Sequence, residues 1–137
     1  MAGAFEVIGI DANVLVRFLV DDDPEQNAAA RRFLSGRTAD DPAFVSALVI
    51  AETAWVLNRR LKYPMPVVSD LLLDLISADG LVVEYTEELD ALLSVAQPKA
   101  DFADYLIFWS ARRAGCRSVV TFDETAAKAI PGMELLA

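Results

Sequence analysis

Four carboxylates in this 137-residue chain stand in apolar surroundings that do not easily accommodate a charge. Asp11 ends an apolar run, Glu52 interrupts a long apolar stretch, and two further acids border apolar runs nearer the end of the chain, Asp104 and Asp123. An unpaired carboxylate in such surroundings is costly unless something neutralises it. A divalent cation would neutralise several acids at once, so the pattern indicates a metal site built from oxygen ligands.

The composition narrows the chemistry further. The chain contains no His and a single cysteine, Cys116, which excludes a zinc site of nitrogen and sulfur ligands and any His-based triad. The net charge of −9 has the wrong sign for a protein that coats nucleic acid non-specifically, but it does not exclude an enzyme that acts on nucleic acid. Short basic clusters could bind phosphate, or could simply be solvated helix faces. These clusters are Arg31 with Arg32, Arg59 with Arg60 and Lys62, and Arg112 with Arg113 and Arg117.

Length and hydropathy favour a single domain over residues 1–137, long enough to bury a core without disulfides. Charges interrupt the apolar stretches too often for a membrane span, and we expect no leader peptide. The lone Cys116 suits a reducing compartment, so a cytoplasmic location is expected.

Short apolar runs alternate with longer segments of helical periodicity. The predicted strands are 5–10, 43–46, 81–85, 118–122 and 133–136. The predicted helices are 13–20, 24–35 with Asp23 as N-cap, one capped by Ser46 that reaches residue 60, 67–78 after Pro64 and Pro66 break the pattern, 87–96, 101–113 ended by Gly115, and 124–129. Such alternation predicts an α/β fold with a mainly parallel sheet covered on both faces.

This order of elements can bring the acids together. Asp11 and Asp123 lie just past the carboxyl ends of predicted strands, the edge at which open α/β sheets bind ligands. Asp104 lies in the first turn of its helix, and Asp101 is three residues earlier on the same face. Glu52 lies in the second turn of its helix, where its apolar neighbours predict that it faces inward.

Each aspartate also has a purely structural interpretation. Asp123 could cap the helix that follows it, and Asp101 could cap its own helix while Asp104 interacts with the helix dipole. Asp11 could bend the chain out of its strand through an Asx turn.

For Glu52 the structural alternative is a long-range ion pair with Arg17 or Arg59. Independent explanations at four places are less economical than one shared site.

Four motifs, in order along the chain, resemble those of PIN-domain ribonucleases, and most closely the VapC-type toxins of bacterial and archaeal toxin–antitoxin pairs. The motifs are Asp11-Ala12-Asn13-Val14-Leu15-Val16-Arg17, Glu52-Thr53-Ala54-Trp55-Val56-Leu57, Asp101-Phe102-Ala103-Asp104 and Thr121-Phe122-Asp123. Ala12 departs from the pattern, because the family commonly has Thr or Ser there. The resemblance implies a three-layer α/β/α PIN-like fold.

It also implies a function, the Mg²⁺- or Mn²⁺-dependent endonucleolytic hydrolysis of RNA. Asp11, Glu52, Asp104 and Asp123 would form the catalytic quartet. Asp11, Asp104 and Asp123 would be the metal ligands, with Asn13 and Asp101 in supporting roles. A hard cation held by carboxylates can activate water and neutralise phosphate, which agrees with this assignment.

The resemblance further implies a homodimer and a cognate antitoxin, whose tail would lie in an apolar groove and send an Arg or Lys toward the acids. The segment 67–76 favours a dimer independently, because Leu71, Leu72 and Leu75 help to spread apolar side chains nearly all round one helix. Such a helix is either central or shared with a second subunit.

Three alternatives remain open: a PIN-type nuclease outside a toxin–antitoxin pair, a phosphotransferase with Asp11 as nucleophile, and a non-catalytic protein-binding module. Phosphotransferases of that kind usually carry a second Asp where this chain has Asn13. The protein-binding module would use its acids to receive an Arg of the partner.

Overall fold

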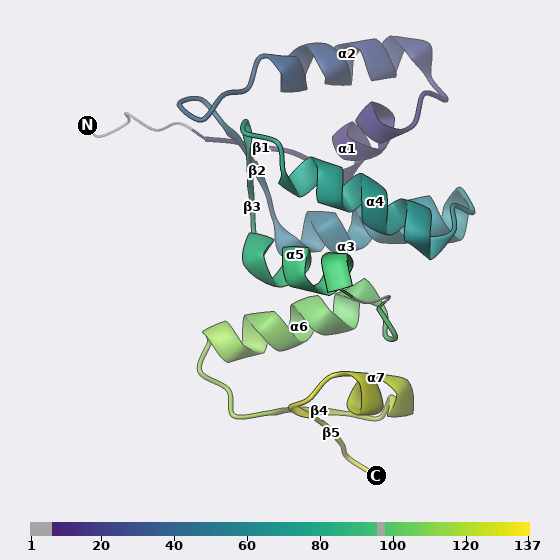
Figure 1. The fold of residues 1–137 in the computed structure, drawn as a ribbon, viewed down its shortest axis with the longest axis vertical. Coiled ribbons are helices and arrows are strands. Elements are labelled where there is room, and N and C mark those ends of the chain that lie inside the picture. Colours follow the sequence, from purple (N-terminus) through teal and green to yellow (C-terminus); the bar gives the residue numbers. More distant parts are fainter. Residues whose placement is uncertain (1–6, 96–97) are drawn as a thin grey trace. The chain divides into compact units, whose positions relative to one another are not determined.

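The computed structural model describes residues 7–95 and 98–137. The chain divides into two compact units, Met1–Val95 and Ala96–Ala137. Figure 1 traces the order of the elements along the chain. Each unit combines parallel strands with helices, so the predicted α/β fold, a parallel sheet flanked by helices, is confirmed.

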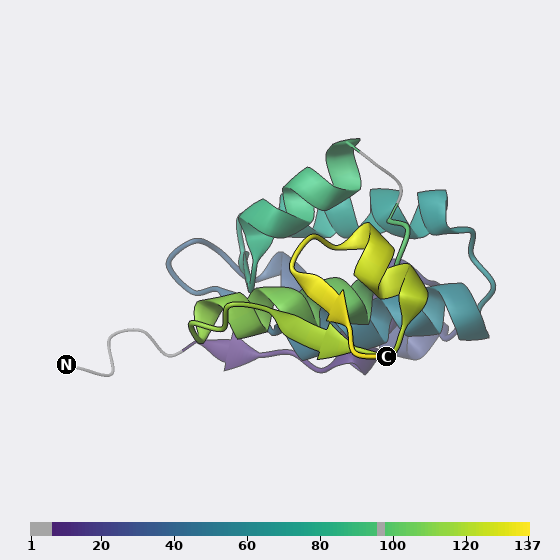
Figure 2. The same ribbon diagram turned by 90° about the horizontal axis from the view of Figure 1, so that it is seen from below.

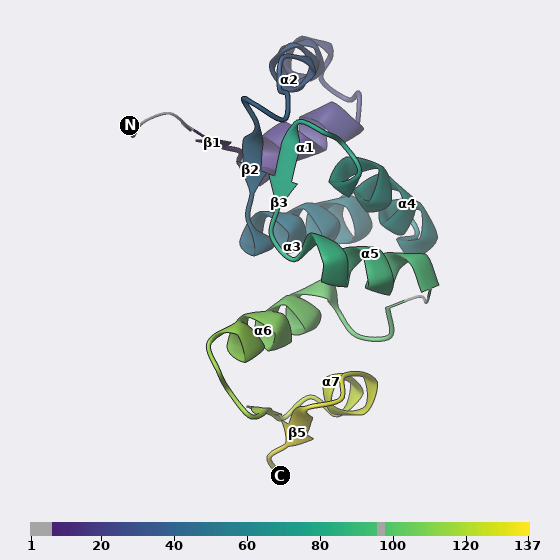
Figure 3. The ribbon, with the colours of Figure 1, turned by 60° about the vertical axis from the view of Figure 1, so that its left-hand side comes forward.

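The first unit contains a three-stranded parallel sheet in the order β1-β2-β3 (Figure 3). The strands are β1 (Ile8–Gly9), β2 (Ala43–Val45) and β3 (Leu81–Val83). The helices are α1 (Ala12–Leu19), α2 (Pro24–Ser35), α3 (Ala47–Trp55), a π-helical turn η1 (Val56–Arg60), α4 (Met65–Ile76) and α5 (Thr86–Val95). Parallel pairing places the carboxyl ends of all three strands at one edge, from which α1, α3 and α5 start.

Two helix starts in this unit follow directly from local sequence. The side chain of Asp23 accepts a hydrogen bond from the Gln26 N–H at 3.1 Å, and Pro24 occupies the first helical position of α2. The hydroxyl of Ser46 accepts from the Val49 N–H at 3.2 Å and caps α3. Both predicted caps are confirmed, since each satisfies an N–H that the helix itself leaves unpaired.

Helix α4 takes its apolar residues into the unit. Leu72 and Leu75 are buried, while Leu71, Leu73 and Ile76 are half-buried. The helix packs against α5 and β3, so a central position accounts for its composition. The apolar composition of α4 therefore gives no separate reason to expect a second subunit.

The second unit contains α6 (Phe102–Arg113), β4 (Val119–Thr121), α7 (Glu124–Ala129) and β5 (Met133–Leu135). Strands β4 and β5 pair in parallel, and α7 packs against both (Figure 2). The core of this unit is formed by Phe108, Ala126, Ile130 and Met133. Its α6 ends with Gly115 at φ 92°, the conformation expected for a glycine just beyond a helix.

Most of the predicted bounds differ from the observed ones by one or two residues, and the following differences bear on the fold. The strand predicted at 5–10 is reduced to β1, with residues 5 and 6 outside the described part of the chain, and its Ile8 is 45% exposed rather than buried. Helix α4 begins at Met65, because Pro66 in a first turn gives up no helical hydrogen bond. The helix predicted to reach residue 60 ends in the π-helical turn, and the predicted helix end at Ala96 lies outside the described residues.

Among the described residues, no helix is both long and apolar enough to cross a membrane.

Gly132 tests the packing of the second unit. It has φ 102°, and a Cβ atom there would lie 2.5 Å from Cε1 of the Phe108 ring. We expect Gly132→Ala to lower the free energy of unfolding by about 2–4 kcal/mol, because backbone strain and a ring clash act together. Urea unfolding measures this change.

Gly115→Ala is the matched control, because Gly115 has φ 92° and nothing within 4 Å of an added Cβ. It should show only the backbone cost, about 1–2 kcal/mol. Equal effects of the two substitutions would contradict the predicted contact with Phe108.

Candidate active site

Asp11 connects the buried Ile10 to α1. It occupies the N-cap position with extended backbone, and its carbonyl oxygen accepts from the Val14 N–H at 3.1 Å. Its side chain is exposed and makes no capping hydrogen bond with the described first turn of α1. The carboxylate is therefore not used to cap the helix, and it is accessible to a ligand.

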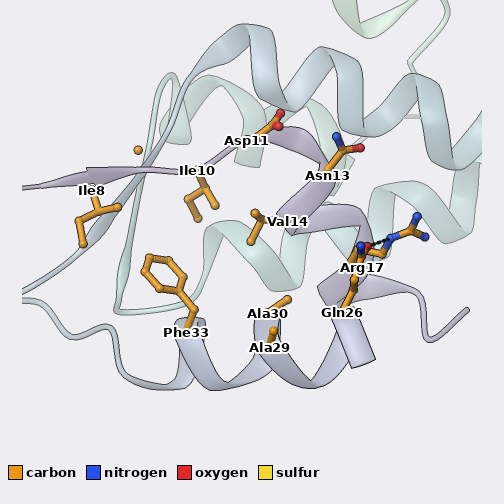
Figure 4. Close-up of a pocket in the computed structure, with 11 residues that line it drawn as sticks. Ile8, Ile10, Asp11, Asn13, Val14, Arg17, Gln26, Ala29, Ala30 and Phe33 are labelled. Atoms are coloured by element: carbon orange, nitrogen blue, oxygen red, sulfur yellow. Dashed lines mark hydrogen bonds between the residues drawn. The ribbon is translucent and has the colours of Figure 1, made fainter. Parts of the chain in front are cut away.

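Asn13 lies beside Asp11 at the edge of a hollow of about 570 Å³. The floor of this hollow is apolar, formed largely by Ile10, Val14 and Phe33. In Figure 4 the Asp11 carboxylate and the Asn13 amide point away from these apolar side chains, on the same side of the start of α1. The two polar groups therefore lie on one side of the start of α1, facing away from the apolar part of the hollow.

Arg17, at the other end of the same hollow, is held by neighbouring side chains. Its Nη1 lies 2.8 Å from Oδ1 of Asp22, and its Nε donates to Oε1 of Gln26 at 2.7 Å. The proposed ion pair of Arg17 with Glu52 is therefore replaced by a local one.

Glu52 is exposed, so the prediction that it faces inward is wrong. Its neighbours Thr53 and Ala54 take the inward positions, together with Ile50 one turn earlier. The phase of α3 is thus set by packing of its most apolar face, which leaves Glu52 on the outside.

Asp104 lies in the first turn of α6 and is half-buried. Partial burial raises the pKa of its carboxyl, and the negative charges of Asp101 and Asp123 raise it further. A hydrogen bond with the backbone at Asp101 acts in the opposite direction on this pKa. Asp101 and Asp123 therefore each lie within electrostatic reach of Asp104 in the second unit.

Asp123 has a structural role as well. Its Oδ1 accepts from the Ala126 N–H at 3.1 Å and caps α7, while its own N–H donates to the Thr121 hydroxyl at 3.0 Å. The capping alternative is confirmed for this residue. It uses one carboxylate oxygen and fixes the direction of the other, which suits a residue that also binds a ligand.

Asp101 does not behave as the capping alternative expects. It holds the N-cap position of α6 by its backbone, but its side chain makes no capping hydrogen bond in the described structure. The capping alternative for this side chain is therefore not supported, and the negative charge of Asp101 raises the pKa of Asp104.

Glu84 is a positioning residue that the sequence analysis missed. It follows β3, and its Oε1 accepts from the Ala47 N–H at 2.7 Å, at the N-terminus of α3. Together with Ser46 it fixes the start of the helix that carries Glu52. Its only sequence signal is an acid directly after a predicted strand.

The predicted site residues thus fall into two groups. Asp11, Asn13 and Glu52 belong to the first unit, and the three aspartates around Asp104 belong to the second. Within the described ranges, no three His, Cys, Asp or Glu side chains form a group that could hold a metal ion by itself. The sharing of one site by both groups remains a prediction.

The raised pKa of Asp104 predicts a pH-dependent stability. An acid with a raised pKa binds its proton more tightly in the folded state, so its ionisation costs stability as pH rises through that pKa. In EDTA at pH 7, we expect Asp104→Asn to melt about 1–3 °C above the parent. The difference should vanish near pH 3, where both folded and unfolded carboxyls are protonated.

Thermal melts between these pH values measure the effect, and Asp70→Asn, at an exposed acid of α4, is the control. If the parent protein and Asp104→Asn had the same melting temperature at every pH, the predicted effect of Asp104 ionisation would be contradicted.

The chain matches the PIN domain family over residues 8–130, a segment that spans both units and contains every predicted site residue. No curated protein matches the chain. PIN domains are generally nucleases that use divalent metal ions. With nearly its whole length covered by this match, the chain belongs to the PIN-domain family.

Proposed function

We propose that this protein is a Mg²⁺- or Mn²⁺-dependent endoribonuclease, and that it acts as the toxin of a VapC-type toxin–antitoxin pair in the cytoplasm. The observation that carries the nuclease assignment is the match to the PIN family over residues 8–130, which is supported by the two acids, Asp101 and Asp123, whose charges raise the pKa of Asp104. A cation would relieve the repulsion that Asp104 experiences from Asp101 and Asp123.

The donor chemistry fits a hard divalent ion. Every candidate ligand is a carboxylate oxygen, and the chain contains no His to favour a softer metal. Asp11, Asp104 and Asp123 would hold the ion, with Asp101 supporting Asp104 through its charge. When bound, such an ion neutralises charge on a phosphate and makes water more acidic.

The protein's own groups would supply the rest. Glu52, exposed on α3, can accept a proton from water or orient it. The Asn13 amide, beside Asp11, can donate to a phosphate oxygen or hold the carboxylate in place. The cap from Asp123 to Ala126 restricts the direction of the Asp123 carboxylate.

A cognate antitoxin is part of this proposal. The apolar hollow beside Asp11 suits an apolar segment of an inhibitor, and an Arg or Lys next to that segment would reach round the start of α1 to the exposed carboxylate. Such a cation would compete with the metal ion for the same acids, which gives inhibition an electrostatic cause.

The cleavage of single-stranded RNA tests the enzymatic assignment. We expect Asp11→Asn, Glu52→Gln, Asp104→Asn and Asp123→Asn each to lower the single-turnover rate by about 100-fold or more, because neutral isosteres keep the shape and lose the charge. Asn can still cap α7 at position 123, so this variant should remain folded. EDTA should abolish cleavage by the parent.

Asp70→Asn again serves as the control and should cleave at the parental rate, with circular dichroism confirming that each variant is folded. Parental rates for both Asp11→Asn and Asp104→Asn would show that the site is assigned wrongly.

A homodimer is also proposed. Large apolar side chains remain exposed on the second unit, among them Phe122 at 73% and Val120 at 59%. We expect light scattering at tens of micromolar to give twice the mass of the chain. A strictly monomeric species under these conditions would contradict the dimer.

A further inference from the structure

The outer face of α3 combines an acid with two exposed apolar side chains. Leu48 is 77% exposed and Trp55 is 55% exposed. Glu52 is also exposed and lies four residues after Leu48 and three before Trp55, so helical periodicity places all three on one face. The inward side of α3 is buried through Ile50, Thr53 and Ala54. Two large apolar side chains exposed on one face of a helix form a candidate contact surface.

We propose that Trp55 is a stacking platform for a base of single-stranded RNA, which positions the strand so that a neighbouring phosphate passes Glu52. This inference rests on the proposed ribonuclease function. Indole rings stack on any base, and unpaired bases of single-stranded RNA are commonly bound in this way. Leu48 extends the apolar surface on the other side of the acid.

The charge that follows Trp55 along the chain fits the phosphate backbone. Arg60 and Lys62 are exposed directly after this face, in and just beyond the π-helical turn. In a chain with a net charge of −9, this basic cluster is a local exception. A strand stacked on Trp55 could therefore place its next phosphates beside these cations.

A second copy of the chain fits this face less well. Any surface that covered both Leu48 and Trp55 would also cover Glu52 between them. That would desolvate the carboxylate and would close it off from substrate. A single strand of RNA covers a narrower track and brings its phosphate to the acid, so RNA is the occupant that the arrangement favours.

The predicted consequence is a loss of RNA affinity. Trp55→Ala should weaken RNA binding about 10-fold, whereas Trp55→Phe, which keeps an aromatic face, should stay within about 3-fold of the parent. The single-turnover rate at saturating RNA should change much less than the concentration of half-saturation. Ile107→Ala, which removes another exposed apolar side chain (53% exposed, on α6), is the matched control and should bind normally.

Fluorescence gives a direct readout of stacking. The chain has two tryptophans, so Trp109→Phe leaves Trp55 as the only one. In this background, with Asp104→Asn to prevent cleavage, a ten-nucleotide single-stranded RNA should quench the Trp55 emission in a saturable manner. The same oligonucleotide with abasic positions should bind more weakly and quench little.

The outcomes separate the inference from the function on which it rests. If anisotropy of a labelled strand shows that RNA binds but the Trp55 emission is not quenched, the stacking role is wrong. The ribonuclease assignment would then remain intact. Failure of the parent to cleave RNA would instead refute the ribonuclease assignment, whatever the fluorescence shows. If Trp55→Ala converts a dimer into a monomer while RNA affinity per chain is unchanged, this face is an interface between copies, and the inference is wrong. Should Trp55→Ala fail to fold, the Trp55→Phe variant and the abasic oligonucleotide still decide.

Discussion

The candidate site must accommodate the repulsion between Asp104 and two neighbouring carboxylates. The pKa of Asp104 is raised by its partial burial and by two neighbouring acids, so ionisation of this residue works against folding at neutral pH. A chain without His cannot relieve that repulsion with an imidazolium. A cation from solution is the simplest counter-charge, and the family to which the chain belongs generally uses one.

The acids are positioned by the regular elements next to them and by a few hydrogen bonds. Asp11 and Asp123 each follow a parallel strand and precede a helix, so their backbones are fixed by two regular elements. Asp123 gains a further restraint from its bond to Ala126. Glu52 is fixed indirectly, since the carboxylate of Glu84 and the hydroxyl of Ser46 together define where α3 begins. Rigid supports of this kind are what a site needs if its ligands are to meet one ion with little reorganisation.

Local features were predicted well from the sequence, and long-range ones were not. The Asp23 and Ser46 caps, the extent of α7 and the glycine end of α6 depend on residues a few positions apart, and the structure confirms them. The outward position of Glu52 could not be predicted from its sequence neighbours. The rotation of α3 about its axis depends on which of its apolar sides packs against other elements. The role of Glu84 depends on a contact between residues 37 positions apart, which no local pattern encodes. Asp101 looked like a cap by its position, but the side chain interacts with charge instead.

The proposed function assigns one divalent ion to Asp11, Asp104 and Asp123, and Mn²⁺ binding tests this central proposal most directly. Titration followed by electron paramagnetic resonance should give about one tight site per chain. Asp11→Asn in the first unit and Asp104→Asn in the second should each weaken Mn²⁺ binding about 10-fold or more. The double variant should weaken Mn²⁺ binding by less than the product of the two single effects. If substitutions in only one unit weakened Mn²⁺ binding, a shared centre would be contradicted. Independent losses of affinity at two separate sites would contradict it as well.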